Sequence, residues 1–179
     1  MHGEDKTRQG LLQSLSKLQS LTLLCVGAGV APMIHALRTI LRKEKGIQIS
    51  MLYGVREVED ILLKDVLEGF LAEYPDRFRL LYCVGSRWAN VHMAAKNKEE
   101  YLPPPPPKNF HTLSNAALGW INESKIREHG FPPCSQTRVI VCGLPGVYDK
   151  LCGPRNCPRV MPDTILFEIG YTDEMVIKL

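Results

Sequence analysis

The chain has 179 residues, of which 45% are hydrophobic and 23% are charged, a balance typical of one soluble globular domain with a sizeable core. Its formal net charge of +3 is too small to indicate nucleic acid or an anionic membrane surface as a partner. The N-terminus is polar rather than signal-like, and the longest apolar stretch, 21–37, is interrupted by glycines, Pro32 and His35, so the sequence predicts no membrane segment and a cytoplasmic location.

Strands and helices alternate in the first half of the chain. Short apolar runs such as LTLLCV predict buried strands, and apolar residues at helical spacing predict the helices between them. The first helix is predicted to begin at Pro32 and to stop at Gly46, and Pro75 ends the second. In chain order the predicted elements are a strand at 21–26, a helix at 32–45, a strand at 47–54, a helix at 57–74 and a strand at 77–85. This alternation favours parallel strands joined by right-handed crossovers.

The alternation breaks at 86–114, a segment without clean periodicity that contains the consecutive prolines Pro103 to Pro107. Such a run forms stiff polyproline II, which suits a surface insertion or, alternatively, a docking ligand for a partner. Beyond this insertion a short helix is predicted at 122–130, with Asn122 as its cap and Gly130 as its stop.

Two more apolar runs complete a predicted sheet of five strands. The run TRVIVCGLPG predicts a fourth strand and a turn, and TILFEIG, at 164–170, predicts a fifth strand. The sequence therefore predicts an α/β fold with three αβα layers around a five-stranded, mainly parallel, Rossmann-like sheet. Residues 1–20 are predicted to form a lead-in and residues 21–179 a single domain.

Three of the predicted strands end alike, in Cys25–Gly27, Cys83–Gly85 and Cys142–Gly143. The carboxyl ends of parallel strands share one edge of a sheet, which is where open α/β sheets bind their ligands. Glycine at such a position lets a ligand approach the backbone closely. The three segments are therefore predicted to meet at one binding edge.

The stretch CVGAGVAPM, at 25–33, has the form of a phosphate-binding turn. A strand, a glycine turn and a helix start aim backbone N–H groups at one point, and the helix dipole adds partial positive charge there. Pro32 suits the first helical position because its missing N–H would have no partner there. A pyrophosphate is the expected occupant, and a structural turn without a ligand is the alternative.

The six cysteines do not have the spacing of a secreted disulfide framework. Cys25, Cys83 and Cys142 fall in apolar runs, where a buried, reduced thiol is expected. Cys152 and Cys157 flank the sequence GPRN, and a metal-binding or disulfide pair is an open alternative there. The sequence contains no recognisable zinc site, P-loop or nucleophile elbow, so no metal is predicted.

Six segments together resemble the NAD(P)H-binding half of the cytochrome b5 reductase family, within the ferredoxin–NADP reductase superfamily. They are GAGVAPM, LYGVREVEDILLKDVLEGF, RFRLLYCV with Trp88, GWINESKIREHGFPP, VIVCGLPGV and GYTDEMVIKL. Their order and spacing cover most of residues 20–179, interrupted by the proline-rich insertion. The resemblance implies that NAD(P)H gives a hydride to FAD, which passes single electrons to a haem protein such as cytochrome b5.

The resemblance also assigns a role to each residue of the glycine turn. Gly27 and Gly29 would let the backbone approach the pyrophosphate of the cofactor, with Ala28 between them. Pro32 would start the helix behind that pyrophosphate. Ala28 stands where a threonine is common in the family, so it cannot cap the helix or donate to the cofactor through a hydroxyl.

A second group of assigned residues concerns the nicotinamide and the second strand. Cys142 matches the cysteine beside the nicotinamide, where it would position the ring and not act as a nucleophile; a buried strand cysteine is the alternative. Gly143 and Pro145 would shape the same wall. Tyr53 and Gly54 would close the second strand, near where the dinucleotide runs.

Two features of the sequence give opposite indications of whether the chain prefers NADH or NADPH. Asp60 matches an acidic position that disfavours the extra phosphate of NADPH in NADH-preferring members, although it could also be an ordinary acid at a helix start. Ser86 and Arg87 resemble the phosphate-binding pair of NADPH-using relatives, and the planar fork of arginine suits a phosphate. We favour NADH, with NADPH as the alternative.

The flavin domain of the family is not recognisable in this chain, because neither its arginine–tyrosine strand nor its glycine–serine turn is found before Leu21. We therefore expect an excised or truncated domain, little active alone, that works with an upstream FAD-binding domain in a parent enzyme that can be attached to a membrane. A non-catalytic nucleotide-binding or interaction module with the same fold is the alternative. A short-chain dehydrogenase is excluded because no tyrosine has a lysine four residues later.

Overall fold

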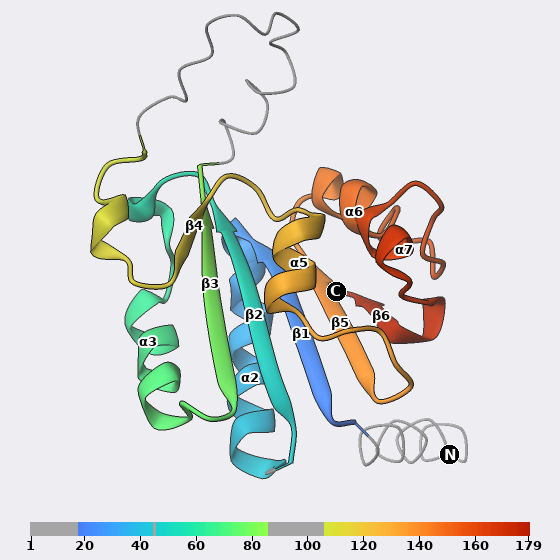
Figure 1. Ribbon diagram of the computed structural model, residues 1–179, viewed down its shortest axis with the longest axis horizontal. Helices are drawn as coiled ribbons and strands as arrows, with labels where there is room; N and C mark the ends of the chain where they lie inside the picture. The colour runs from blue at the N-terminus through green and yellow to red at the C-terminus, as the bar shows by residue number, and fades with distance from the viewer. Residues whose placement is uncertain (1–17, 45, 86–105) are drawn as a thin grey trace, which may run out of the picture.

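The computed structural model describes residues 18–44, 46–85 and 106–179. In these ranges six strands form one sheet in the order β4-β3-β2-β1-β5-β6, and every neighbouring pair is parallel. The strands are β1 (Ser20–Val26), β2 (Gln48–Val55), β3 (Phe78–Val84), β4 (Ala116–Leu118), β5 (Thr137–Cys142) and β6 (Val176–Lys178). Their carboxyl ends therefore lie along a common edge, as predicted (Figure 1).

Helices cover both faces of the sheet, which confirms the three αβα layers (Figure 1). One face is covered by α2 (Val30–Lys43) and α3 (Lys64–Glu73), and the other by α5 (Glu123–His129), α6 (Pro145–Leu151) and α7 (Ile165–Ile169). Successive residues of a strand supply alternate cores: Leu23 and Cys25 of β1 pack with α2, whereas Leu24 packs with α5 and α6.

The helix α2 begins two residues earlier than predicted. Its buried residues Val30, Met33, Leu37 and Leu41 recur every three or four positions, the spacing of a helix that buries one face. Pro32 is therefore the third helical residue and not the first. An N–H at this position would still have no partner inside the helix, so proline remains compatible with it.

The helix predicted at 57–74 is wrong in its first half. Val58–Asp60 forms a 3-10 turn, and α3 begins only after it. The break is at Leu63, whose φ of 56° lies in the left-handed region. Just before it, the N–H of Leu62 donates to the hydroxyl of Tyr53 at 3.2 Å. Because Tyr53 is buried and holds this segment, the chain runs along the carboxyl edge of the sheet before the helix starts.

The strand predicted at 164–170 is also wrong, because this segment forms α7. Leu166 is buried while Phe167 and Glu168 are exposed, and Gly170, with a φ of 102°, ends the helix. The sheet has six strands and not five because β4 and β6 join it. Each of these strands has three residues, too few to show the alternation that predicts a strand.

Helix α5, the cysteines, and the searches for metal clusters and membrane spans complete the description of these residues. The helix α5 is confirmed, with the side-chain oxygen of Asn122 accepting from the N–H of Lys125 at 3.0 Å and Gly130 at its end. All six cysteines are free thiols, so Cys152 and Cys157 form no disulfide. No cluster of three or more metal-binding side chains occurs in the described ranges, and no helix there has the length and apolarity needed to span a bilayer.

Candidate functional site

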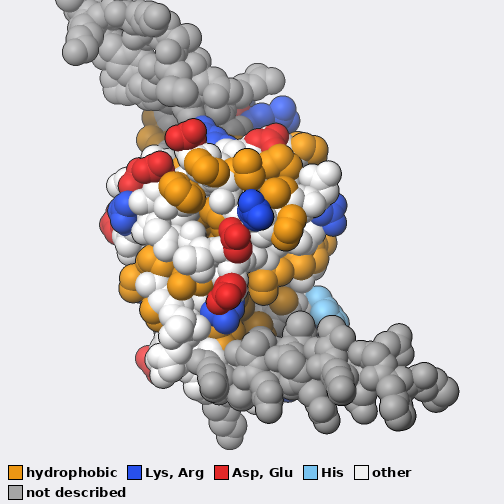
Figure 2. Space-filling view, turned by 90° about the vertical axis from the view of Figure 1, so that its right-hand side faces the viewer, with side chains coloured by type: hydrophobic (Ala, Val, Ile, Leu, Met, Phe, Trp, Pro, Cys, Tyr) orange, Lys and Arg blue, Asp and Glu red, His pale blue; other side chains and the backbone are white. Residues whose placement is uncertain are grey.

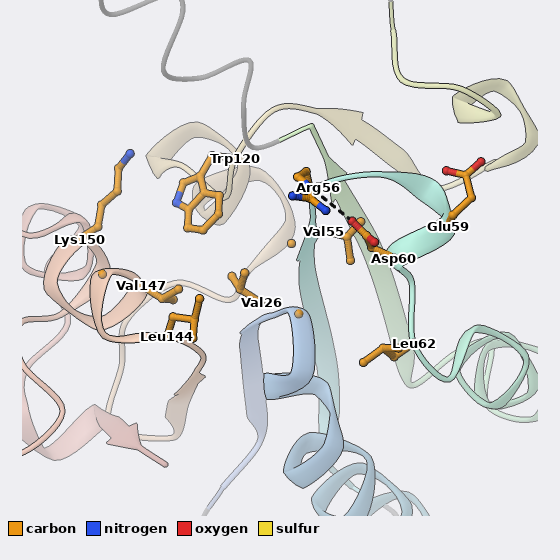
Figure 3. A pocket seen from close by; sticks show the side chains of 13 residues that line it. Val26, Val55, Arg56, Glu59, Asp60, Leu62, Trp120, Leu144, Val147 and Lys150 are labelled. Carbon is orange, nitrogen blue, oxygen red and sulfur yellow. Dashed lines mark ion pairs between the residues drawn. The ribbon is translucent and has the colours of Figure 1, made fainter.

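A cleft of about 850 Å³ opens at the carboxyl edge of the sheet. Figure 3 shows its walls: the ends of β1 and β2 form the floor, residues 55–62 form one side, and Trp120 with residues 144–150 form the other. These segments lie far apart in the sequence and meet because parallel strands end on the same side. The cleft is thus at the place where open α/β sheets bind their ligands.

The glycine turn between β1 and α2 is a 3-10 turn, Gly27–Gly29. Gly27 has a φ of 54°, and a Cβ built on it would have no atom within 4 Å, so this position needs glycine for its backbone angle and borders open space. In the described part of the chain no side chain caps the N-terminus of α2, and its first turn contains no acidic residue. The dipole and N–H groups of this 14-residue helix therefore favour an anion in front of the turn.

Gly29 has a different role from Gly27. A Cβ built on Gly29 would come within 2.5 Å of the carbonyl oxygen of Cys142, at the end of β5. Gly29 is therefore needed so that the turn can pack against β5, and its role in the approach of a pyrophosphate stays a prediction. This contact brings the glycine turn and Cys142 to the same place.

Charged side chains form one end of the cleft. Arg56 directly follows β2, and its Nε lies 3.6 Å from Oδ2 of Asp60 (Figure 3). The same oxygen of Asp60 accepts from the N–H of Glu57 at 3.2 Å. Glu59 points away from this pair and accepts from Nδ2 of Asn109 at 2.6 Å. The Asp60 carboxylate is therefore oriented through one oxygen, and its charge is balanced by Arg56.

Trp120 forms the opposite wall, between β4 and α5. Its indole Nε1 is buried and has no hydrogen-bond partner among the described residues. Nζ of Lys150 lies 6.0 Å from the centroid of the Trp120 ring. An indole with a cation beside it offers a flat surface on which an aromatic ring of a ligand can stack.

Cys142 is half-buried at the end of β5, and hydrogen bonds fix the turn that follows it. The N–H of Gly143 donates to the hydroxyl of Tyr148 at 3.3 Å, and this hydroxyl donates to the carbonyl of Leu179. Burial raises the pKa of the Tyr148 phenol, so it remains a neutral donor at physiological pH. The turn beside Cys142 is thus held by α6 and by the end of β6.

The structure distributes the predicted site residues over two neighbouring hollows. Gly27, Gly54 and Asp60 line the main cleft. Gly143 and Pro145 line a second hollow of about 470 Å³ on the other side of the start of α6.

Three other predicted residues have described positions near these hollows. Ala28 is exposed on the glycine turn, and Pro32 is exposed on the first turn of α2. Tyr53 is fully buried under the cleft wall, so it supports residue Leu62 and does not line the cleft. Ser86 and Arg87, predicted to bind a phosphate, lie outside the described residues.

Sequence reasoning missed four polar or aromatic residues of the cleft: Arg56, Glu59, Trp120 and Lys150. Arg56 had a usable signal, since it stands two residues beyond the glycine that ends the second predicted strand. Trp120 lies in the segment GWINESKIREHGFPP, which carries part of the resemblance, but the resemblance assigned it no role. Lys150 had no signal, because it reaches the cleft only through the packing of α6 onto the sheet.

Comparison with known families and curated proteins gives one family and several relatives. Residues 23–113, half of the chain, match the family model of the oxidoreductase NAD-binding domain. The NADH-cytochrome b5 reductase 2 of Saccharomyces cerevisiae is 25% identical over 166 residues, covering 91% of this chain and 48% of the relative. That of Aspergillus terreus is 28% identical over 167 residues, covering 91% and 45%. The chain thus spans about half the length of the curated relatives it matches.

Solved structures share the fold. The cytochrome b5 reductase domain of Ulva prolifera nitrate reductase has a TM-score of 0.65 at 20% identity, covering 90% of this chain and 49% of that one. The CS-b5R domains of human Ncb5or, in the NAD+ form, give a TM-score of 0.56 at 16% identity, covering 93% and 38%. Together with the family model and the curated relatives, they confirm the resemblance to the nucleotide-binding half of the cytochrome b5 reductases.

Proposed function

Because the chain belongs to the oxidoreductase NAD-binding domain family, we propose that it is the pyridine-nucleotide-binding domain of a flavin-dependent NAD(P)H oxidoreductase resembling the cytochrome b5 reductases. The observation that carries this proposal is the packing of Gly29 against Cys142. It joins a phosphate-binding turn to the strand end expected beside a nicotinamide, at the rim of a cleft of about 850 Å³.

The cleft and the turn after β5 beside it would hold a dinucleotide in three parts. The open space in front of Gly27 and the N-terminus of α2 suit the pyrophosphate. The charged pair of Arg56 and Asp60 suits the sugar on one side of it. On the other side, Cys142 and the hydrogen-bonded turn at Gly143 would position the nicotinamide.

The contribution of this domain to the reaction is to position the nicotinamide ring. When bound, the reduced nicotinamide supplies a hydride to a flavin, which is held by another domain. The chain's own task is to hold the ring at the distance and angle that this transfer needs, about 3–3.5 Å from its acceptor. The rigid turn between β5 and α6 serves that task, and Cys142 needs no ionised thiol for it.

A partner domain that brings FAD needs a surface on which to dock. Figure 2 shows hydrophobic side chains among charged ones over the face that carries α6, α7 and β6. Large hydrophobic residues exposed there are Leu144, Met161, Phe167 and Ile177. Leu144 is 73% exposed and also lines the cleft, so a partner docked on it would cover the cleft beside Cys142. We propose an FAD-binding domain at this place and a haem protein such as cytochrome b5 as the final electron acceptor.

Nucleotide binding is tested by titrating the chain with NADH and recording energy transfer from tryptophan to the reduced nicotinamide. We expect saturable binding with a Kd between about 1 μM and 1 mM, the range of enzyme affinities for such substrates. Gly27→Asp places a negative side chain in the open space before α2 and should weaken binding at least about tenfold, since a charge-assisted contact is lost. Gly46→Asp, at an exposed position outside the cleft with no atom near its Cβ, is the matched control and should bind like the wild type.

The catalytic part of the proposal has its own test. The chain is joined to an FAD-binding domain of a cytochrome b5 reductase, and flavin bleaching is recorded after NADH is added. Reduction of the flavin supports the oxidoreductase, whereas NADH binding without flavin reduction supports a non-catalytic nucleotide-binding module.

A further inference from the structure

We propose that Arg56 allows the cleft to accept a 2′-phosphorylated dinucleotide, NADPH, as well as NADH. The inference rests on the proposed function, because it assigns a specificity-determining residue to the same cleft. It concerns the pair of Arg56 and Asp60 at the end of β2.

The fold places this pair where the adenosine sugar is expected. In sheets of this type the pyrophosphate lies on the turn after one strand, and the sugar lies at the end of the next strand outward. Here β1 carries the glycine turn, and β2 pairs with it so that Val26 is in register with Gly54. Arg56 and Asp60 both line the cleft just beyond Gly54.

Asp60 alone would favour NADH. A carboxylate accepts a hydrogen bond from a 2′-hydroxyl and repels a 2′-phosphate. Its Oδ2 already accepts from the N–H of Glu57 and faces Nε of Arg56 at 3.6 Å. The other oxygen, Oδ1, is therefore left for a ribose hydroxyl, while the adjacent guanidinium balances the negative charge that a phosphate would meet.

Arg56 supplies the donors that a phosphate needs. In the described part of the chain the one partner recorded for its side chain is Asp60, which lies 3.6 Å from Nε, so the two terminal nitrogens are available to a ligand. Their planar fork can donate two parallel hydrogen bonds to phosphate oxygens. The pair is exposed, with 55% of the Arg56 side chain and 44% of the Asp60 side chain accessible, so the guanidinium can turn toward a ligand at little cost.

The neighbouring charges leave room for this contact. Glu59, the second acid of the wall, is drawn away by its 2.6 Å hydrogen bond to Asn109. Lys150 lies on the opposite wall, beside Trp120. The end of the cleft at β2 is therefore an acid–base pair and not an uncompensated acidic patch.

The test compares the Kd values of NADH and NADPH for the full chain, Arg56→Gln and Arg38→Gln. Arg38 is an exposed arginine of α2 outside the cleft, so its variant controls for the loss of one positive charge. We expect the wild type to bind the two nucleotides within about tenfold of each other. Arg56→Gln should weaken NADPH about tenfold or more and NADH less than about twofold, because only the phosphate loses a charge-assisted contact. Adenosine 2′,5′-bisphosphate and AMP lack the nicotinamide. Arg56→Gln should weaken the binding of the bisphosphate and leave that of AMP nearly unchanged.

The outcomes separate this inference from the proposed function. If neither nucleotide binds, the proposed function fails. If NADH binds and NADPH binds more than about 100-fold more weakly, or if Arg56→Gln and Arg38→Gln change both affinities alike, only the role of Arg56 is overturned. Circular dichroism shows whether each variant is folded before its affinities are compared.

Discussion

Gly29, after β1, packs directly against the carbonyl oxygen of Cys142, at the end of β5: a Cβ on Gly29 would approach this oxygen to 2.5 Å. The two residues are neighbours in space because β1 and β5 are adjacent parallel strands whose ends are in register at Cys25 and Cys142. The glycine turn is thus built onto the sheet before any ligand binds. We therefore expect a nucleotide bound in front of this turn to lie beside the strand end at Cys142.

Gly29→Ala should destabilise the protein, because the added methyl group meets backbone atoms that cannot rotate away. We expect a loss of about 2–3 kcal/mol in the free energy of unfolding, as for other overpacked sites. Urea unfolding followed by circular dichroism measures it. Gly69→Ala is the matched control. Gly69 lies in α3, and a Cβ built on it would have no atom within 4 Å. Alanine there should therefore raise the free energy of unfolding by about 0.5–1 kcal/mol. Equal effects of the two substitutions would contradict the packing role of Gly29.

The main strands and the binding turn were predictable because their signals are local. The strands β1, β2, β3 and β5 are apolar runs of six to eight residues, and the glycine turn follows the first of them. The segment TILFEIG is equally apolar, but it forms the helix α7, in which Leu166 is the buried residue. Short apolar runs do not distinguish a strand from a buried helical turn.

The walls of the cleft were less predictable than its floor. Arg56 and Asp60 face each other because the chain breaks at Leu63 and stays over the sheet, held by the hydroxyl of Tyr53. The periodicity of 57–74 predicts one continuous helix, which would have carried Asp60 away from the sheet edge. A tertiary hydrogen bond from a buried tyrosine overrides the local helical preference here, and no local pattern reports it.

Tyr148→Phe should weaken the binding of the nicotinamide part of NADH without changing the binding of its adenosine part. The variant removes the hydroxyl that accepts from Gly143 and donates to the carbonyl of Leu179. We expect a loss of about 1–2 kcal/mol in the free energy of unfolding, since two half-buried backbone groups lose a partner. Titration should show weaker NADH binding and unchanged AMP binding. Tyr74→Phe, at the end of α3, should leave both affinities unchanged, and a parallel loss for AMP in Tyr148→Phe would contradict a role limited to the nicotinamide end.

Lys178→Met should loosen the loop between α6 and α7. Nζ of Lys178 lies 2.8–3.1 Å from five backbone carbonyls of this loop, those of Cys152, Gly153, Pro154, Cys157 and Arg159. Methionine keeps the length of the side chain and removes its charge, so we expect a loss of about 2 kcal/mol in the free energy of unfolding, the value of hydrogen bonds to a charged group.

Amide hydrogen exchange locates the effect of Lys178→Met. The N–H groups of Cys157 and Met161, which donate to carbonyls within the loop, should exchange faster than in the wild type. Lys43→Met, at the exposed end of α2, should change neither stability nor exchange in the loop. Unchanged protection of Cys157 and Met161 in Lys178→Met would show that the ammonium does not hold the loop.

The stability of the protein should fall as the pH rises above about 9, and Cys83 should account for part of the fall. Burial raises the pKa of the Cys83 thiol to about 12, against the nearby charge of Lys125, which lowers it. The unfolded thiol titrates near pH 8.5–9, so between about pH 9 and 12 the folded state retains a proton that the unfolded state has lost. The free energy of unfolding therefore decreases with pH in this window, by at most about 1.4 kcal/mol per pH unit for this one group.

Urea unfolding of Cys83→Ala at pH 8 to 11 tests this contribution. The variant should be less stable at pH 8, because a buried side chain has been truncated, but its stability should fall less steeply above pH 9. Burial also raises the pKa of Cys152 to about 11 and that of Tyr171 to about 12, so part of the alkaline slope should remain. Cys134→Ala is the control: a hydrogen bond with Thr137 lowers the pKa of this exposed thiol, which is ionised in both states above pH 9 and adds no slope. Parallel curves for Cys83→Ala and the wild type would show that the thiol is not protected from ionisation by burial.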